Sequence, residues 1–241
     1  LFRSEIQTTA SARTGGDYLA RASHYRRQRS LDDFTFPAMF ARRIKAYGER
    51  YGLTDEDLAH FAVKAYANAN LNPLAHMHSK TCTFEHAKSA HDRNPNFLGN
   101  EEFRPYLKVT DCSQVSDGAS VLLLASEAGI AKLGRTLSDT VEIAGRGHAV
   151  DSLYTDGDMT ELTTVRHATH QAMVDAGISV GDLDIAEVHD CFTIAELMSY
   201  EAIGLADKGQ GAALAASGAT ALDGKVPVNT GGGLIGFGHP V

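Results

Sequence analysis

The last thirteen residues of the chain place one histidine in a loop that has almost no side chains. They read Asn-Thr-Gly-Gly-Gly-Leu-Ile-Gly-Phe-Gly-His-Pro-Val. Glycine permits positive φ angles and a close approach of backbone to ligand, and proline fixes the exit from the loop. An apolar run precedes the glycines, which favours an active-site loop over a flexible tail. We therefore predict that His239 is catalytic and that Asn229, Gly233 and Gly238 contact the substrate.

A second group that could do chemistry is His-Asp-Cys-Phe at residues 189–192. It lies between an expected strand and an expected helix, and the positive end of a helix lowers the pKa of a nearby thiol. An imidazole beside the thiol can donate or accept a hydrogen bond. We predict that Cys191 is a reactive thiol assisted by His189. The alternative for Cys191 is a small buried apolar residue.

The elements that must position these residues alternate between strand and helix from residue 108 onward. Apolar runs and turn residues predict buried strands at 120–125, 140–143, 185–188 and 226–228, and helices at 126–134, 160–176 and 193–205. Thr193 and Glu196 have the spacing of a capping box. The helix at 160–176 is expected to bury Leu162, Val165, Ala168, Ala172 and Met173. Strands that alternate with helices predict an α/β fold.

The first part of the chain does not show this alternation of strands and helices. Residues 1–33 show no convincing period and are expected to be loop with one short strand. Two amphipathic helices follow at 35–51 and 54–69, and Thr54 can cap the second. They predict a small helical subdomain over roughly residues 34–100.

The second half of this subdomain is rich in potential metal ligands: His76, His78, Cys82, His86 and His91. Zinc sites usually have tight paired spacings, which this stretch lacks. We therefore predict no metal site and expect exposed or hydrogen-bonded histidines. A zinc protein built on His76, His78, Cys82 and His86 is a competing hypothesis.

Composition limits the class of protein. The chain has 241 residues, of which 43% are hydrophobic and 22% charged, as in ordinary globular domains. A net charge of −8 argues against nucleic acid as a partner, and no run approaches the roughly eighteen apolar residues of a membrane span. Three cysteines cannot all pair, which indicates a reducing, intracellular compartment. We expect Cys82 and Cys112 to be structural.

Charge is unevenly distributed along the chain. Residues 1–50 contain ten Arg or Lys and five Asp or Glu, a balance of +5, so the remainder carries −13. The basic end is a candidate for phosphate contact, although a solvated basic face is the favoured explanation. The candidate residues are Arg26, Arg27, Arg29, Arg42, Arg43 and Lys45.

Three ordered motifs resemble those of the thiolase superfamily. They are Val-Ser-Asp-Gly-Ala at 115–119, His-Asp-Cys-Phe at 189–192 where most thiolases have Asn-Glu-Ala-Phe, and Gly-Phe-Gly-His-Pro at 236–240. The second motif is most similar to that of the sterol-carrier-protein-type thiolases. The resemblance implies a partial, layered αβαβα fold with an inserted helical loop domain. The implied regions are the loop domain at 1–107, the end of the amino-terminal catalytic half at 108–135, and the beginning of the carboxy-terminal half at 136–241.

The same resemblance implies the chemistry. His239 would activate a nucleophilic cysteine, Cys191 would be a second, acid/base cysteine, and His189 would help form the oxyanion hole. The substrate would be a 3-ketoacyl-CoA, cleaved by coenzyme A or formed by the reverse Claisen condensation. Coenzyme A would be a substrate covered by the loop domain, with no further cofactor. The protein would be a homodimer or homotetramer of lipid metabolism, as in fatty acid β-oxidation.

Two features depart from the thiolase pattern. The family's nucleophilic cysteine belongs to an amino-terminal domain, and none of the three cysteines here matches its position. The match also stops before the remainder of the carboxy-terminal domain. We therefore expect the central part of a thiolase, which cannot complete a catalytic cycle alone. The alternative is a thiolase-like protein that binds acyl-CoA or a partner subunit without catalysis.

Overall fold

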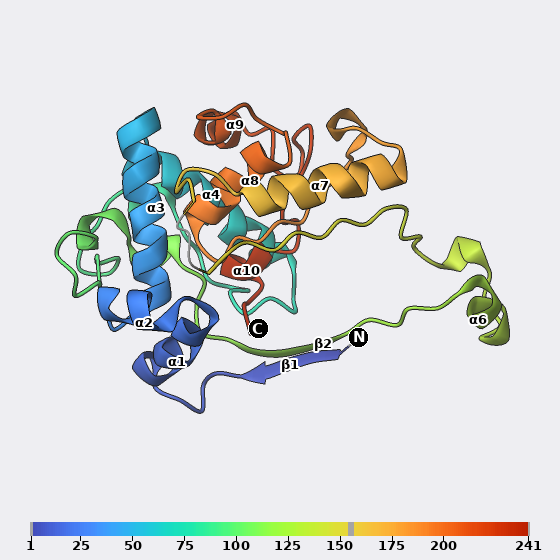
Figure 1. The fold of residues 1–241 in the computed structure, drawn as a ribbon, viewed down its shortest axis with the longest axis horizontal. Helices are drawn as coiled ribbons and strands as arrows, with labels where there is room; N and C mark the ends of the chain where they lie inside the picture. The colour runs from blue at the N-terminus through green and yellow to red at the C-terminus, as the bar shows by residue number, and fades with distance from the viewer. Residues whose placement is uncertain (1, 154–156, 241) are drawn as a thin grey trace.

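The computed structural model describes residues 2–153 and 157–240. Figure 1 shows a helical body and a long excursion that carries α6 (Glu127–Lys132) away from it. A two-stranded antiparallel sheet lies along one side of the body and pairs β1 (Phe2–Ile6) with β2 (Asp117–Val121). No helix within these ranges is both long and apolar enough to cross a membrane.

Two long helices confirm the amphipathic pattern of the first part of the chain: α3 (Thr35–Tyr51) and α4 (Asp55–Leu71). α3 ends at Gly52, whose φ of 80° is the left-handed conformation that favours glycine. α4 begins with the predicted cap. The Thr54 hydroxyl accepts a hydrogen bond from Asp57 N, and the Asp57 carboxylate accepts one from Thr54 N.

The core lies where α3, α4 and α8 (Thr193–Ala202) meet. Aromatic rings fill much of it, since Phe61 packs on Tyr200 with centroids 5.5 Å apart and Phe40 stacks on Phe192 at 4.3 Å. α8 is buried on all sides from its first residue to Tyr200. α8 therefore lies inside the body, and the turn that precedes it joins a packed element.

The other helices are α1 (Ala12–Leu19), α2 (Tyr25–Gln28), α5 (Phe84–Ala87), α7 (Thr163–Ala176), α9 (Gly211–Ala216) and α10 (Gly233–Gly236). Short 3₁₀ turns span Ala20–Ala22, Arg29–Leu31, Arg104–Tyr106, Val109–Asp111, Leu137–Asp139 and Val180–Asp182. α1 and α2 correct the expectation of loop before residue 34. α1 contains Gly15 and Gly16, which weaken its sequence signal, but the Ser11 hydroxyl caps its first turn.

Several expected strands do not form ladders in the described residues. Residues 140–143 have no strand partner there, and residues 185–188 and 226–228 share a single bridge, between Ala186 and Val228. The apolar run at 120–125 is a strand only to Val121, and the Leu123 side chain is 77% exposed instead of buried. A strand is stabilised by its neighbours, so local β propensity does not suffice to form one.

α7 begins three residues later than expected and ends at the predicted Gly177, whose φ is 68°. None of its residues is buried, which corrects the expected inward face. Extended chain lies along it, because Arg146 N donates to the Asp175 carboxylate and His148 N donates to the Gln171 side chain. The spacing of apolar residues predicted the position of α7 correctly, but it did not predict how exposed those residues are.

We expect Leu58→Ala to lower the free energy of unfolding by about 2–5 kcal/mol, because this α4 side chain is fully buried in the core. Leu71→Ala, at the end of the same helix, is the control. Its side chain is 72% exposed, and we expect a change within about 0.5 kcal/mol. Urea denaturation followed by circular dichroism measures both, and equal losses would contradict this placement of the core.

Candidate active site

Two loops that are distant in the sequence meet at the candidate site. We call them the cysteine turn, residues 189–192, and the histidine loop, residues 229–240. They bring His189 and His239 together edge to face, with ring centroids 5.3 Å apart and an interplanar angle of 85°. Two residues predicted from separate motifs therefore lie side by side.

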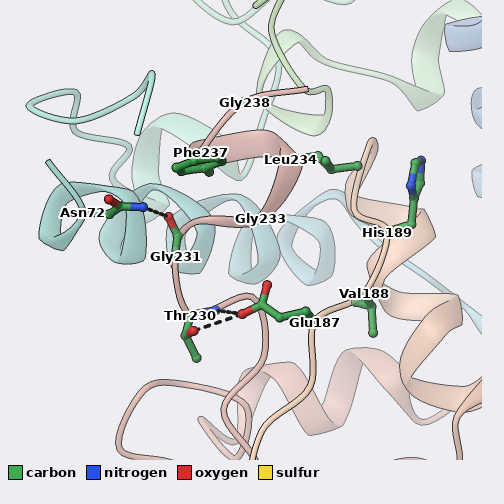
Figure 2. Close-up of a pocket in the computed structure, with 10 residues that line it drawn as sticks. All are labelled: Asn72, Glu187, Val188, His189, Thr230, Gly231, Gly233, Leu234, Phe237 and Gly238. Atoms are coloured by element: carbon green, nitrogen blue, oxygen red, sulfur yellow. Dashed lines mark hydrogen bonds between the residues drawn. The ribbon is translucent and has the colours of Figure 1, made fainter. Parts of the chain in front are cut away.

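The segments that lead into these loops are joined by hydrogen bonds. Ala186 N donates to Pro227 O and Asn229 N donates to Ala186 O, each at 3.0 Å. The Glu187 carboxylate accepts from Thr230 N at 2.9 Å and from the Thr230 hydroxyl at 3.0 Å (Figure 2). The two loops therefore start side by side, from segments that are hydrogen-bonded to each other.

A buried carboxylate connects the loops themselves. Asp190 is fully buried, and it accepts hydrogen bonds from Leu234 N at 2.6 Å and Ile235 N at 3.4 Å. These amides begin α10, so the carboxylate caps a helix from outside it. Only glycine fits at 233, because a Cβ there would lie 2.2 Å from Asp190 Oδ2 and φ is 61°. Asp190 thereby fixes the path of the chain toward His239.

The sequence pattern gave no role to Asp190. Local spacing does not show which amides a carboxylate will meet 44 positions away. The one available signal is that Asp190 lies between His189 and Cys191, because any contact that holds Asp190 also positions its two neighbours.

A second buried carboxylate lies behind the first. Glu196 accepts a hydrogen bond from the Tyr200 hydroxyl at 2.5 Å and forms an ion pair with Lys64, which also donates to Val228 O at 2.9 Å. Burial raises the pKa of Asp190 to about 7, and the nearby Glu196 charge adds to this rise. Asp190 is therefore poised to exchange a proton near neutral pH.

The predicted capping box at the start of α8 is wrong. Phe192 occupies the cap position, and the Thr193 hydroxyl donates instead to the Asp111 carboxylate at 3.2 Å. Glu196 is occupied by its ion pair. Tertiary partners take both side chains, so the local motif does not form.

Cys191 is protonated at neutral pH. Cys191 is only 5% exposed. Burial raises the pKa of its thiol to about 12, and the nearby Asp190 adds to this rise. The predicted lowering of this pKa is wrong, because desolvation outweighs the helix end. Burial likewise raises the pKa of Cys82 to about 11 and that of Cys112 well above its usual range. Cys191 thus has the properties of a proton donor.

His189 is neutral at neutral pH. Desolvation lowers the pKa of its imidazole, and the adjacent His239 lowers it further. A neutral imidazole carries one N–H and one acceptor nitrogen. His189 can therefore donate a hydrogen bond to an oxygen that develops negative charge.

A cavity of about 590 Å³ opens beside the two loops. Figure 2 shows Asn72 and His189 on opposite sides of the histidine loop, with Gly233 and Gly238 between them. Two of the predicted substrate contacts, Gly233 and Gly238, therefore line it. The other lining residues are Glu187, Val188, Thr230, Gly231, Leu234 and Phe237. The mixture of apolar side chains and a few polar groups is typical of small-molecule sites.

Asn229, the third predicted substrate contact, is fully buried. Its side-chain oxygen accepts from Val188 N at 2.8 Å, and its backbone oxygen accepts from the Asn68 side chain at 2.9 Å. Its φ of 55° is unusual for a residue other than glycine. Asn229 therefore shapes the start of the histidine loop, and a direct substrate contact stays a prediction.

The histidine-rich stretch does not assemble a metal centre. Among the described residues no group of three or more His, Cys, Asp or Glu could hold a metal ion. His76 Nδ1 is hydrogen-bonded to Ser116 Oγ at 2.7 Å, and His86 packs against His91 with centroids 4.9 Å apart. His76 and His86 therefore have other contacts in the described residues, and their placement does not support the competing zinc hypothesis.

Known proteins resemble the chain in sequence. Residues 145–241 match a family model described as thiolase C-terminal domain-like. The chain is 32% identical over 210 residues to acetyl-CoA acetyltransferase of Methanothermobacter thermautotrophicus, which covers 86% of this chain and 51% of that protein. It is also 32% identical over 210 residues to sterol carrier protein 2 of Homo sapiens, with coverages of 85% and 36%. The chain spans 51% or less of these relatives' own lengths.

Two solved structures share the fold. An Ltp2-ChsH2(DUF35) aldolase superposes with a TM-score of 0.77 at 23% identity, covering 99% of this chain and 59% of that one. A monomeric SCP2-thiolase like protein type 1 from Mycobacterium smegmatis gives a TM-score of 0.65 at 21% identity, with coverages of 84% and 42%. These comparisons confirm the predicted thiolase resemblance and the thiolase-like α/β fold.

We expect Gly233→Ala to destabilise the protein by about 2–4 kcal/mol, from left-handed backbone strain and the clash with Asp190. Gly15→Ala in α1 is the matched control, because a Cβ there meets nothing within 4 Å. Its effect should be neutral or stabilising. Chemical denaturation compares the two, and a tolerated Gly233→Ala would contradict the close approach of Asp190.

The stability of the protein should fall with rising pH through Asp190. The folded pKa of about 7 lies above the ordinary 3.8, so the native state binds this proton more tightly than the unfolded chain. Relative to Asp190→Asn, the wild type should lose up to about 4 kcal/mol between about pH 4 and pH 7. Unfolding free energies measured across this range test it, with the exposed Asp223→Asn as control. Parallel curves for wild type and Asp190→Asn would rule out the shift.

Proposed function

We propose, on the premise of its similarity to thiolases, that the chain carries the proton-transfer residues of an acyltransferase acting on 3-ketoacyl-CoA. The meeting of the His189 and His239 rings, in loops joined by the buried Asp190, is the observation that supports this most. Cys191 lies two residues from His189 in the same turn. The name of the Methanothermobacter relative, acetyl-CoA acetyltransferase, describes a reaction of the same class.

In the proposed reaction His239 accepts the proton of a nucleophilic cysteine, whose sulfur attacks the 3-keto carbon of the substrate. The bond between C2 and C3 breaks, leaving the shortened acyl group on that sulfur and an acetyl-CoA enolate. His189 donates a hydrogen bond to the enolate oxygen. Cys191 delivers its thiol proton to C2, which completes acetyl-CoA.

The second half of the cycle restores both proton carriers. The thiol of an incoming coenzyme A gives its proton to the Cys191 thiolate and attacks the acyl-cysteine. Acyl-CoA shortened by two carbons leaves, and His239 returns its proton to the nucleophile. Reversal of the same steps gives the Claisen condensation.

The acid/base role of Cys191 is supported by its pKa of about 12. A thiol with so high a pKa keeps its proton until a stronger base, the enolate carbon, has formed. In this proposal none of the three cysteines is the nucleophile implied by the thiolase resemblance, because none matches its position and burial raises the pKa of each. In this proposal it comes from outside these 241 residues.

Coenzyme A serves as a substrate in this proposal, and no further cofactor takes part. Its phosphates are proposed to lie at the basic amino-terminal region. There Arg29 is paired with Asp17 at 2.5 Å and Lys45 with Glu102 at 2.7 Å, and Arg26 is the first candidate for phosphate contact. Assembly as a homodimer or homotetramer and a place in fatty acid β-oxidation belong to the same proposal.

A second candidate function is aldolase-type cleavage of a 3-hydroxyacyl-CoA. The paired histidines favour it, because a retro-aldol step needs a base for the 3-hydroxyl proton and a donor for the enolate but no thiolate. His239 would take the hydroxyl proton, and the C2–C3 bond would break to give a carbonyl product and a CoA-thioester enolate. Cys191 would protonate C2, and the proton on His239 would then return to the Cys191 thiolate. A non-catalytic acyl-CoA-binding protein is the remaining alternative.

We expect the purified chain to exchange the C2 protons of acetyl-CoA for deuterium. In this proposal His239 takes the thiol proton of Cys191, the Cys191 thiolate takes a C2 proton, and His189 donates to the enolate oxygen, so no nucleophile is required. Cys191→Ala should lower the protein-dependent rate by roughly 100-fold or more. Cys82→Ala is the control and should stay within about twofold, since Cys82 lies outside the site. Proton NMR of acetyl-CoA in D₂O measures the exchange.

Other results would redirect the proposal. Binding of acetyl-CoA by calorimetry without exchange would favour the non-catalytic alternative, and cleavage of 3-hydroxyacyl-CoA would favour the aldolase. No thiolysis of acetoacetyl-CoA is expected from the chain alone, because its three thiols are all protonated near neutral pH. Thiolysis that disappears with one of these cysteines would overturn the assignment of the nucleophile.

A further inference from the structure

The Ser-Asp-Gly motif at β2 has no part in the proposed reaction, yet it lies against the histidine loop. A Cβ added at Gly118 would stand 3.0 Å from Pro240 Cγ. A Cβ added at Gly238 would stand 3.4 Å from Ser116 Oγ. Figure 1 shows the carboxy-terminal end of the chain beside the β1–β2 pair. The motif therefore supports the loop on both sides of His239.

The Asp117 carboxylate organises the turn that follows β1. Its Oδ1 accepts hydrogen bonds from Gln7 N at 2.7 Å and Thr8 N at 2.9 Å. Its Oδ2 accepts one from the Thr8 hydroxyl at 2.5 Å. Three donors on one carboxylate hold the backbone of this turn, and with it the direction of the Gln7 side chain.

The half-buried side chain of Gln7 reaches the histidine loop. Its Nε2 donates to His239 O at 3.0 Å and to Pro240 O at 2.9 Å. A primary amide has two N–H donors, and both are used here on consecutive carbonyls. Gln7 is 232 positions from His239 and 233 positions from Pro240 in the sequence, so no local pattern could have shown the contact.

Other hydrogen bonds hold the loop before His239. Asp190 holds the start of α10, and His76 N and Met77 N donate to Phe237 O and Gly236 O at 2.8 and 3.0 Å. Gly238 follows with a φ of 137°, in the region that favours glycine. The Gln7 contacts continue this series of hydrogen bonds to the backbone of His239 and Pro240.

We propose that Gln7, held by Asp117, is a positioning residue that fixes the backbone of His239 and thereby sets its ring against His189. The proposal rests on the proposed function in one respect, the use of His239 as the base. Gln7 touches no reacting atom, and its effect on the reaction passes entirely through the placement of the imidazole.

The test uses Gln7→Met, which keeps the side-chain length without donors, and Gln7→Glu, which keeps the shape but turns acceptors toward the two carbonyls. Thr9→Val is the control in the same turn, since its exposed hydroxyl donates to Ile6 O. The ring signals of His189 and His239 are followed by NMR through a pH titration. Deuterium exchange into acetyl-CoA and thermal unfolding are measured on the same samples.

Both Gln7 variants should move the ring signals of the two histidines and raise the pKa of His189 toward its ordinary value, because its neighbour is displaced. Exchange should fall by roughly 10- to 100-fold, as expected when a catalytic group is misplaced by about 1 Å. Thr9→Val should change neither quantity. Asp117→Asn should weaken the same contact, and its effect on exchange should be less than additive with Gln7→Met.

Unchanged ring signals and an unchanged His189 titration in folded Gln7→Met and Gln7→Glu would overturn the proposal. Full additivity of Gln7→Met and Asp117→Asn would also overturn it. A wild-type chain that shows no exchange would count against the proposed function alone. The ring signals would then still decide the role of Gln7, because they are read without substrate.

Discussion

The candidate site depends on the buried carboxylate of Asp190 and the two α10 amides that it accepts. The histidine loop is rich in glycine, and ordering each residue of such a segment costs about 1–2 kcal/mol of backbone entropy. Hydrogen bonds from the Leu234 and Ile235 amides to Asp190, worth about 0.5–1.5 kcal/mol each, oppose that cost. Because Asp190 stands between His189 and Cys191, one anchor sets the positions of both motifs. The close approach requires the missing side chain of Gly233.

Burial then determines the chemistry that these groups can perform. Desolvation disfavours charged forms, so it raises the pKa values of Asp190 and Cys191 and lowers that of His189. At neutral pH the site holds a protonated thiol and a neutral imidazole instead of a thiolate and an imidazolium. Such groups suit proton delivery to a carbanion and hydrogen bonding to an enolate oxygen. The same burial makes Cys191 a poor nucleophile, which separates it from the cysteine that would carry the acyl group.

The fold was predictable where neighbouring residues decide it. The caps at Thr54, Gly52 and Gly177 were read correctly, because a cap depends on residues within one helical turn. Strands were predicted poorly, since residues 140–143 have the right composition but no partner strand among the described residues. The capping box at Thr193 failed for a related reason. Its side chains met stronger partners elsewhere in the fold, and local spacing cannot show that competition.

The sequence by itself determined which residues could do chemistry, because the types and order of His189, Cys191 and His239 are visible in short motifs. Only the tertiary structure decided how they act. It placed two rings 5.3 Å apart, buried the thiol, and linked Asp190 to Leu234 across 44 positions and Gln7 to His239 across 232. Desolvation and long-range hydrogen bonds arise from packing between distant segments. Motif spacing shows neither effect, so the protonation states and positions of the site residues are decided only when the chain folds.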